Sequence, residues 1–105
     1  MDVFSAVADS TRRAVLDMLS RNPLSVTEIG SFFPDISQPG ISKHLKVLKN
    51  AGLVKASIRA QKRVYSLNRN GFMELEKWIS KYQIFWESNL DSLGRFLDDE
   101  SREQK

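Results

Sequence analysis

The residues with the clearest chemical potential are cationic, and they are concentrated in one stretch of the chain. Residues 36–73 contain no aspartate or glutamate, yet they hold eight lysines and arginines and the only histidine. These residues are Lys43, His44, Lys46, Lys49, Lys55, Arg59, Lys62, Arg63 and Arg69. A surface normally mixes both signs of charge, so a block of one sign favours binding to a polyanion. The alternative is a chance surplus of lysine on a solvated face. Which interpretation holds depends on the helices and strands that carry the charges.

Metal binding and catalysis find little support in the same sequence. With no cysteine and one histidine, the chain cannot build a thiolate or histidine-rich zinc site. Carboxylates such as Glu74 and Glu76 are close neighbours on a solvated helix, whereas acid–base catalysis needs a shielded pair. Neither a glycine-rich phosphate loop nor a nucleophile motif is present. We therefore expect no metal, no cofactor and no enzymatic activity.

The spacing of apolar residues predicts two helices at the start of the chain. Val3, Phe4, Val7 and Ala8 share one helical face, which predicts a first helix of about eight residues. Asp9 can cap a second helix, which Asn22-Pro23 ends. The apolar stripe of this second helix consists of Val15, Leu16 and Leu19.

Two further helices are predicted before the end of the basic block. Residues 24–26 are either a short strand or an extended entry to the third helix. Ser25 and Glu28 have the spacing of a capping box, and the third helix then carries Ile29, Phe32 and Phe33 as far as Pro34. Ser37 can cap the fourth helix, with Pro39 in its first turn, and Gly52 ends it. The apolar stripe of the fourth helix consists of Ile41, Leu45 and Leu48.

The opposite face of the fourth helix is polar, cationic and free of acids. Its members are Pro39, Ser42, Lys43, Lys46 and Asn50. Amides at the start of this helix also favour a phosphate. Residues 53–58 and 64–67 are predicted strands, joined by a basic tip at residues 59–63.

Together these features resemble a helix-turn-helix at residues 25–52 followed by a wing at residues 53–68. The second helix of such a motif enters the major groove, where its side chains contact base edges and phosphates. The predicted DNA-binding residues are Ser37, Gln38, Pro39, Ser42, Lys43, His44, Lys46, Arg59, Lys62 and Arg63. His44 has a second interpretation, as a structural residue that flanks the buried stripe. Arg12 and Arg13 either touch phosphates or form intramolecular ion pairs.

Large apolar residues recur every three or four positions from residue 71 to residue 98, which predicts a long last helix. One small domain cannot cover both sides of such a helix, so we expect a two-fold dimer through the first and last helices. The alternative is that these aromatics pack on their own domain, as we expect for Phe72, Leu75 and Ile79. The predicted dimer-interface residues are Val3, Phe4, Val7, Tyr82, Phe85, Trp86, Leu90, Leu93 and Leu97.

Several of these segments resemble the ArsR-type repressors of bacteria and archaea. Residues 37–48, SQPGISKHLKVL, and residues 51–54, AGLV, resemble that family's recognition-helix motif. Residues 8–13, ADSTRR, are similar to its second-helix motif A-D-P-T-R-R, with Ser10 at the proline position. Residues 63–67, RVYSL, resemble its wing return strand, and Gln61 stands where many members carry a glycine. The pattern of Trp78-Ile79, Tyr82, Phe85-Trp86-Glu87 and Leu90-Asp91-Ser92-Leu93 resembles a metal-independent branch of the family.

The expected architecture is a mainly α protein with a small β-hairpin, in the order α-α-(β)-α-α-β-β-α, over a single domain of residues 1–105. Within it, residues 1–9 and 71–98 are the dimerisation helices. The resemblance implies a homodimeric repressor that binds an inverted-repeat operator in double-stranded DNA and occludes a promoter. A winged helix used for protein–protein interaction is the alternative, and the acid-free stretch argues against it. Without an expected leader, membrane span or cysteine, the chain fits the cytoplasm.

Overall fold

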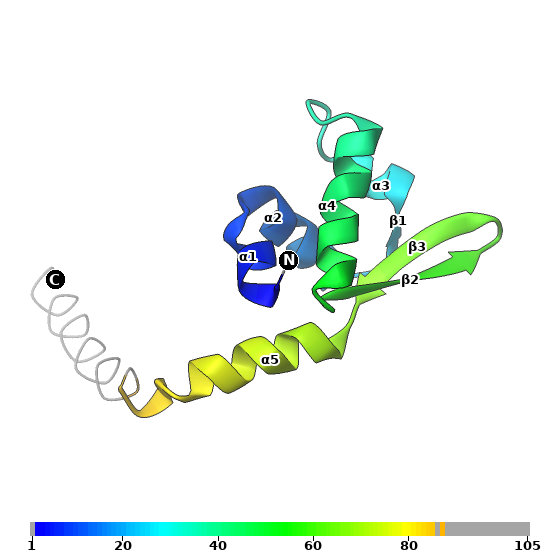
Figure 1. Ribbon diagram of the computed structural model, residues 1–105. Coiled ribbons are helices and arrows are strands. Elements are labelled where there is room, and N and C mark those ends of the chain that lie inside the picture. The colour runs from blue at the N-terminus through cyan, green and yellow to red at the C-terminus, as the bar shows by residue number, and fades with distance from the viewer. Residues whose placement is uncertain (1, 86, 88–105) are drawn as a thin grey trace, which may run out of the picture. The chain divides into compact units, whose positions relative to one another are not determined.

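The computed structural model describes residues 2–85 and 87 (Figure 1). Five helices and three strands have defined bounds in this part of the chain. They follow the order α1 (Val3–Ala8), α2 (Ser10–Leu19), β1 (Leu24–Ser25), α3 (Val26–Ser31), α4 (Gln38–Asn50), β2 (Val54–Arg59), β3 (Lys62–Leu67) and α5 (Arg69–Ser80). The predicted fold, mainly helical with a small antiparallel hairpin, is confirmed.

Side-chain caps fix where the helices begin. The Asp9 carboxylate accepts a hydrogen bond from the Arg12 backbone N–H at 2.9 Å, and α2 starts there. The Ser25 hydroxyl accepts from the Glu28 N–H, while the Glu28 carboxylate accepts from the Ser25 N–H at 2.9 Å. Ser37 caps α4 in the same way through the Gly40 N–H. All three predicted caps are therefore present, and each satisfies an amide that the first helical turn leaves unpaired.

The core lies where α4 crosses the other helices and the sheet. Ile41, Leu45 and Leu48 of α4 are fully buried, together with Ile29 of α3 and Leu53. Val15, Leu16 and Leu19 of α2 are buried beside them, as their spacing predicted. Burial of this one stripe of α4 leaves its opposite face in solvent.

Two apolar positions differ from the prediction. Val3 is 1% exposed and packs in the core of its own chain, because Val3 and Ala6 form the inward face of α1 in place of Phe4 and Ala8. This burial argues against Val3 as a dimer-interface residue. Phe32 is 63% exposed, because α3 ends at Ser31 and the backbone turns before the aromatic side chain reaches the core.

The three strands form an antiparallel sheet in the order β1-β3-β2. Residues 24 and 25 are a strand paired with Tyr65 and Val64, which decides between the two sequence interpretations. The predicted five-residue tip of the hairpin is shorter, because Arg59 pairs directly with Lys62. Ala60 and Gln61 form the turn, with φ of 48° and 65°, the left-handed values that a two-residue type I′ hairpin turn needs.

Residue contacts divide the chain into two units, one ending at Leu75 and the other starting at Glu76. In the first unit, Phe72 and Leu75 of α5 pack against the core, as predicted. The Gly71 N–H donates to the Gly52 carbonyl at 2.8 Å, and Gly52 has the left-handed φ of +79° expected at its position after α4.

The last helix was predicted to run unbroken from residue 71. Instead α5 begins at Arg69 and ends at Ser80, a turn follows at residues 81 and 82, and residues 83–85 are helical again. The N–H of Lys81 bonds to the Trp78 carbonyl, and the N–H of Tyr82 bonds to the Ile79 carbonyl. These bonds span three residues, so the helical ladder is interrupted here. Across the described residues, no helix combines the length and apolar character that crossing a membrane would require.

Candidate nucleic-acid interface

The exposed face of α4 carries most of the residues predicted to contact DNA. Burial of Ile41, Leu45 and Leu48 leaves the predicted contact residues of this helix on its outer side, and all of those contact residues except His44 are exposed. The exposed group consists of Ser37, Gln38, Pro39, Ser42, Lys43 and Lys46. α3 packs against α4, so this face belongs to the second helix of a helix-turn-helix.

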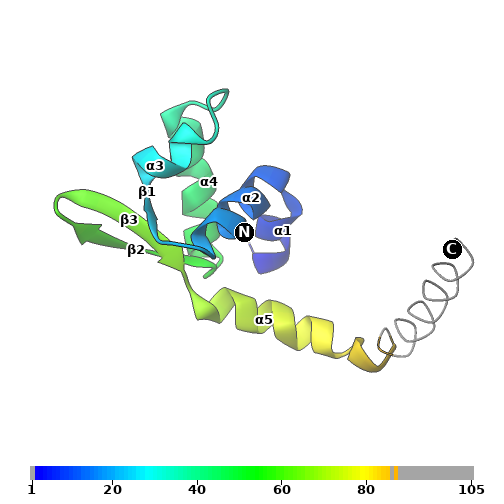
Figure 2. The ribbon, with the colours of Figure 1, turned by 180° about the vertical axis from the view of Figure 1, so that it is seen from behind.

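The hairpin carries the other predicted contacts. Arg59, Lys62 and Arg63 are all exposed, and they lie in the paired strands that flank the turn. The paired β2 and β3 project beyond the helices, as Figures 1 and 2 show. The strand pairing therefore holds these three cations at the projecting end of the sheet.

A hollow of about 370 Å³ joins the helix face to the hairpin. Ser42 and Lys46 of α4 line it together with Arg63 and Tyr65 of β3. Lys49 and Asn50 line it as well, although neither was in the predicted set. The helical spacing could have predicted Lys49, because it follows Lys46 by three residues and so lies on the same side of the helix.

One carboxylate lies near this cationic surface. Glu28 belongs to the acid-containing stretch before residue 36, and the capping bonds from Ser25 lower the pKa of its carboxyl. The positive charge of Lys62 on the hairpin lowers that pKa further. The acid-free block of the sequence therefore does not correspond to an entirely acid-free surface.

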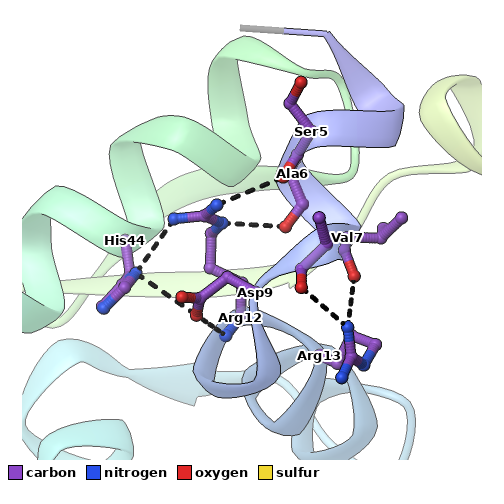
Figure 3. A network of polar contacts seen from close by, with 8 residues as sticks. Ser5, Ala6, Val7, Asp9, Arg12, Arg13 and His44 are labelled. Carbon is purple, nitrogen blue, oxygen red and sulfur yellow. Dashed lines mark hydrogen bonds and ion pairs between the residues drawn. The ribbon is translucent and has the colours of Figure 1, made fainter.

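His44 lies apart from the other predicted DNA contacts. Its side chain is half-buried, with Nδ1 at 3.3 Å from Arg12 Nη1 and 3.9 Å from Asp9 Oδ2, as Figure 3 shows. A histidine that faces α2 cannot also lie on the outer face of α4. These contacts favour the structural interpretation of His44, and a DNA contact by this residue stays a prediction.

The two arginines of the ADSTRR segment hold the end of α1. Arg12 donates through Nε to the Ala6 carbonyl at 2.8 Å and through Nη2 to the Ser5 carbonyl at 3.2 Å (Figure 3). Arg13 donates to the Val7 and Ala8 carbonyls at 2.8 and 3.0 Å. Cations at the carboxyl end of a helix satisfy its unpaired carbonyls and oppose its negative dipole.

Asp9 completes this cluster. The hydrogen bond from the Arg12 backbone N–H lowers the pKa of Asp9, and the charges of the Arg12 and His44 side chains lower it further. One cluster thus links the end of α1, the start of α2 and the middle of α4. Sequence reasoning missed the link to α4, because Arg12 and His44 are 32 residues apart along the chain.

The positions predicted for a dimer interface divide into four groups. Phe4, Tyr82 and Phe85 are exposed, and Val7 is half-buried. Val3 is buried, as described above. Trp86, Leu90, Leu93 and Leu97 lie outside the described residues. In the part of the chain that the structure describes, no three histidine, cysteine, aspartate or glutamate side chains gather where they could hold a metal ion.

Residues 7–55 match the family described as a helix-turn-helix domain. Over 97 residues the chain is 37% identical to the HTH-type transcriptional regulator Rv2034 of Mycobacterium tuberculosis, covering 92% of this chain and 87% of that protein. It is 35% identical to the transcriptional repressor SdpR of Bacillus subtilis over 81 residues, which cover 77% of this chain and 89% of SdpR.

Solved structures show the same fold. The crystal structure of the ArsR family transcriptional regulator RHA00566 superposes with a TM-score of 0.71 at 36% identity, covering 82% of this chain and 88% of that one. A homodimeric winged helix-turn-helix domain of Mb0332 from Mycobacterium bovis has a TM-score of 0.62 at 22% identity, covering 78% of each chain, and shows the fold alone. Because these relatives extend along most of its length, the chain belongs to the ArsR family of winged helix-turn-helix transcriptional regulators.

Proposed function

We propose that this regulator is a repressor that binds an inverted-repeat operator as a homodimer. The observation that carries the proposal is the exposed polar face of α4 beside a cationic hairpin, with one hollow lined by both. An α-helix fits the major groove of B-form DNA, and the lysines and arginines of the helix and the hairpin fit the phosphate backbone. Occlusion of a promoter by the bound dimer is the proposed mechanism of repression.

The helix and the wing have different proposed roles. Gln38, Ser42 and Lys43 lie in the first half of α4, the part of a recognition helix that reaches base edges. Arg59, Lys62 and Arg63 lie on the hairpin, where they supply charge to the flanking backbone. We assign sequence discrimination to the first group and sequence-independent affinity to the second.

A second copy of the chain is the proposed partner for the apolar side chains of its last part. Trp78, Ile79, Tyr82 and Phe85 are all exposed within the described residues. The sequence continues the apolar spacing with Trp86, Leu90, Leu93 and Leu97. The homodimeric Mb0332 domain supports this assignment, because it shares the fold. A dimer would place two α4 helices on two half-sites of one operator.

We also propose that this regulator acts without a metal and is not an enzyme. A chain with no cysteine and one histidine, itself held by Arg12 and Asp9, supports regulation without a metal. The relatives are transcriptional regulators, which supports a non-enzymatic role in the cytoplasm, where the DNA is.

Selection of bound fragments from random or genomic duplex DNA tests this function. We expect one enriched motif with two-fold symmetry and a Kd on the order of 10⁻⁸ M at moderate salt. If no motif is enriched, the surface described here does not recognise DNA sequence. A protein–protein role for the winged helix would then be the better account.

A further inference from the structure

Ile58 is an exposed apolar residue on the cationic hairpin. Its side chain is 76% exposed, although isoleucine is among the residues most often found inside proteins. It follows Val54 and Ala56 on one face of β2, because alternate residues of a strand point to the same side. Val54 is buried and Ala56 partly buried, so Ile58 continues the inward face of the strand past the end of the core.

The register of the hairpin shows which surface this face adjoins. Ile58 pairs with Arg63 across the two strands, and residues directly opposite each other project to the same side of a sheet. Arg63 lines the hollow that Ser42 and Lys46 of α4 also line. Ile58 therefore lies on the side of the hairpin that faces the proposed DNA surface.

We propose that Ile58 is a DNA-contact residue whose side chain packs against an apolar part of a nucleotide. Two groups of DNA offer that chemistry, the C–H surface of a deoxyribose and the methyl of a thymine. The inference rests on the proposed function, because it needs the hairpin to lie on DNA. Arg63 and Lys62 would bind the phosphates and so hold the hairpin on the DNA. The Ile58 side chain would then be buried from water against the sugar or base.

This contact would differ from the neighbouring cationic contacts in its response to salt. Release of counterions makes each lysine or arginine contact weaker as salt rises. Burial of apolar surface has no such dependence, because its driving force is the removal of that surface from water. Loss of Ile58 should thus weaken binding equally at all salt concentrations, whereas loss of Arg63 should flatten the salt dependence.

The test compares Ile58→Thr, Ile58→Val and Arg63→Ala on the operator chosen by the wild type. Threonine keeps the β-branch that suits a strand and removes apolar surface, so the fold and the midpoint of thermal unfolding should not change. We expect Ile58→Thr to lose about tenfold in affinity with an unchanged salt slope, and Ile58→Val to lose less than about fourfold. Arg63→Ala should reduce the slope by about one.

Replacing operator thymines by deoxyuridines separates the two sources of apolar surface. If a thymine methyl is the contact, the wild type loses affinity on the substituted duplex and Ile58→Thr does not. If a deoxyribose is the contact, the substitution does not change the affinity of either protein, and Ile58→Thr binds more weakly than the wild type on both duplexes. The proposal would be overturned if Ile58→Thr bound the operator as tightly as the wild type does. A change in the salt slope of this variant would also overturn it. Failure of the wild type to select any duplex would instead remove the proposed function itself.

Discussion

At the scale of single residues, the charges of the interface have separable roles. Lys62→Ala and Arg63→Ala should weaken binding to all sequences nearly equally and reduce the salt slope by roughly one unit per lost phosphate contact. Gln38→Ala and Ser42→Ala should instead reduce discrimination at one base pair by about 1–3 kcal/mol. Affinities for a set of single-base operator variants, measured at several salt concentrations, check both expectations. If the wing variants changed the base preference and the helix variants did not, the roles assigned to the helix and the wing would have to be exchanged.

Arg12 is the residue that ties α1 to the rest of the domain. It donates to two α1 carbonyls and approaches His44 on α4, so Arg12→Gln leaves carbonyls at a helix end unsatisfied. We expect a loss of about 1–3 kcal/mol in the free energy of unfolding. Arg13→Gln is the matched control, since Arg13 also binds two α1 carbonyls but is exposed. Denaturant unfolding of both variants measures this loss. If both variants lost the same free energy of unfolding, the contact between Arg12 and α4 would not contribute to stability.

At the scale of elements, close packing at the start of α5 depends on a glycine. A Cβ on Gly71 would lie 2.8 Å from the carbonyl carbon and oxygen of Gly52, which are backbone atoms that cannot rotate away. Gly71→Ala should therefore destabilise the fold by about 1–3 kcal/mol. Gly30→Ala in α3 is the control, because its nearest neighbour, Ile41 Cγ1, is 4.0 Å away. Alanine there should be neutral or stabilising, since it favours helix. Thermal unfolding midpoints that fall equally in both variants would contradict this account of Gly71.

Elements defined by local signals could be predicted from the sequence. The caps at Asp9, Ser25 and Ser37 and the stripe Ile41, Leu45 and Leu48 depend on neighbours within a few residues, and all are where the spacing placed them. The exposed face of α4 follows from that stripe, so most of the candidate site was predictable too.

Features that depend on long-range contacts could not be predicted. The position of His44 is set by Arg12, which is thirty-two residues away in the sequence, and the helical period alone left it between core and surface. The tight turn at Ala60 and Gln61 needs left-handed backbone at two residues that carry no turn preference, and strand pairing overrides that local tendency. The inward placement of Val3 similarly depends on how α1 docks, which residue type does not fix.

At the scale of the whole molecule, function is expected to require two copies of the chain. Phe85 is 69% exposed within the described residues, and Phe85→Asp would place a carboxylate in the proposed apolar interface, at a cost of several kcal/mol. We expect this variant to sediment as a monomer at micromolar concentration and to lose far more operator affinity than one phosphate contact explains. Glu87→Gln, at an exposed position nearby, is the control. If the wild type were monomeric and still protected a symmetric operator, the proposed homodimer would be wrong.

Sequence-specific recognition of DNA can be tested by comparing two duplexes. Equilibrium binding of the wild-type protein is measured on the selected operator and on a scrambled duplex of the same length, across a range of salt concentrations. We expect affinity for both duplexes to fall steeply with salt, while the operator stays favoured by at least about 10³-fold at physiological salt. Equal affinity for the two duplexes, or binding insensitive to salt, would contradict this expectation.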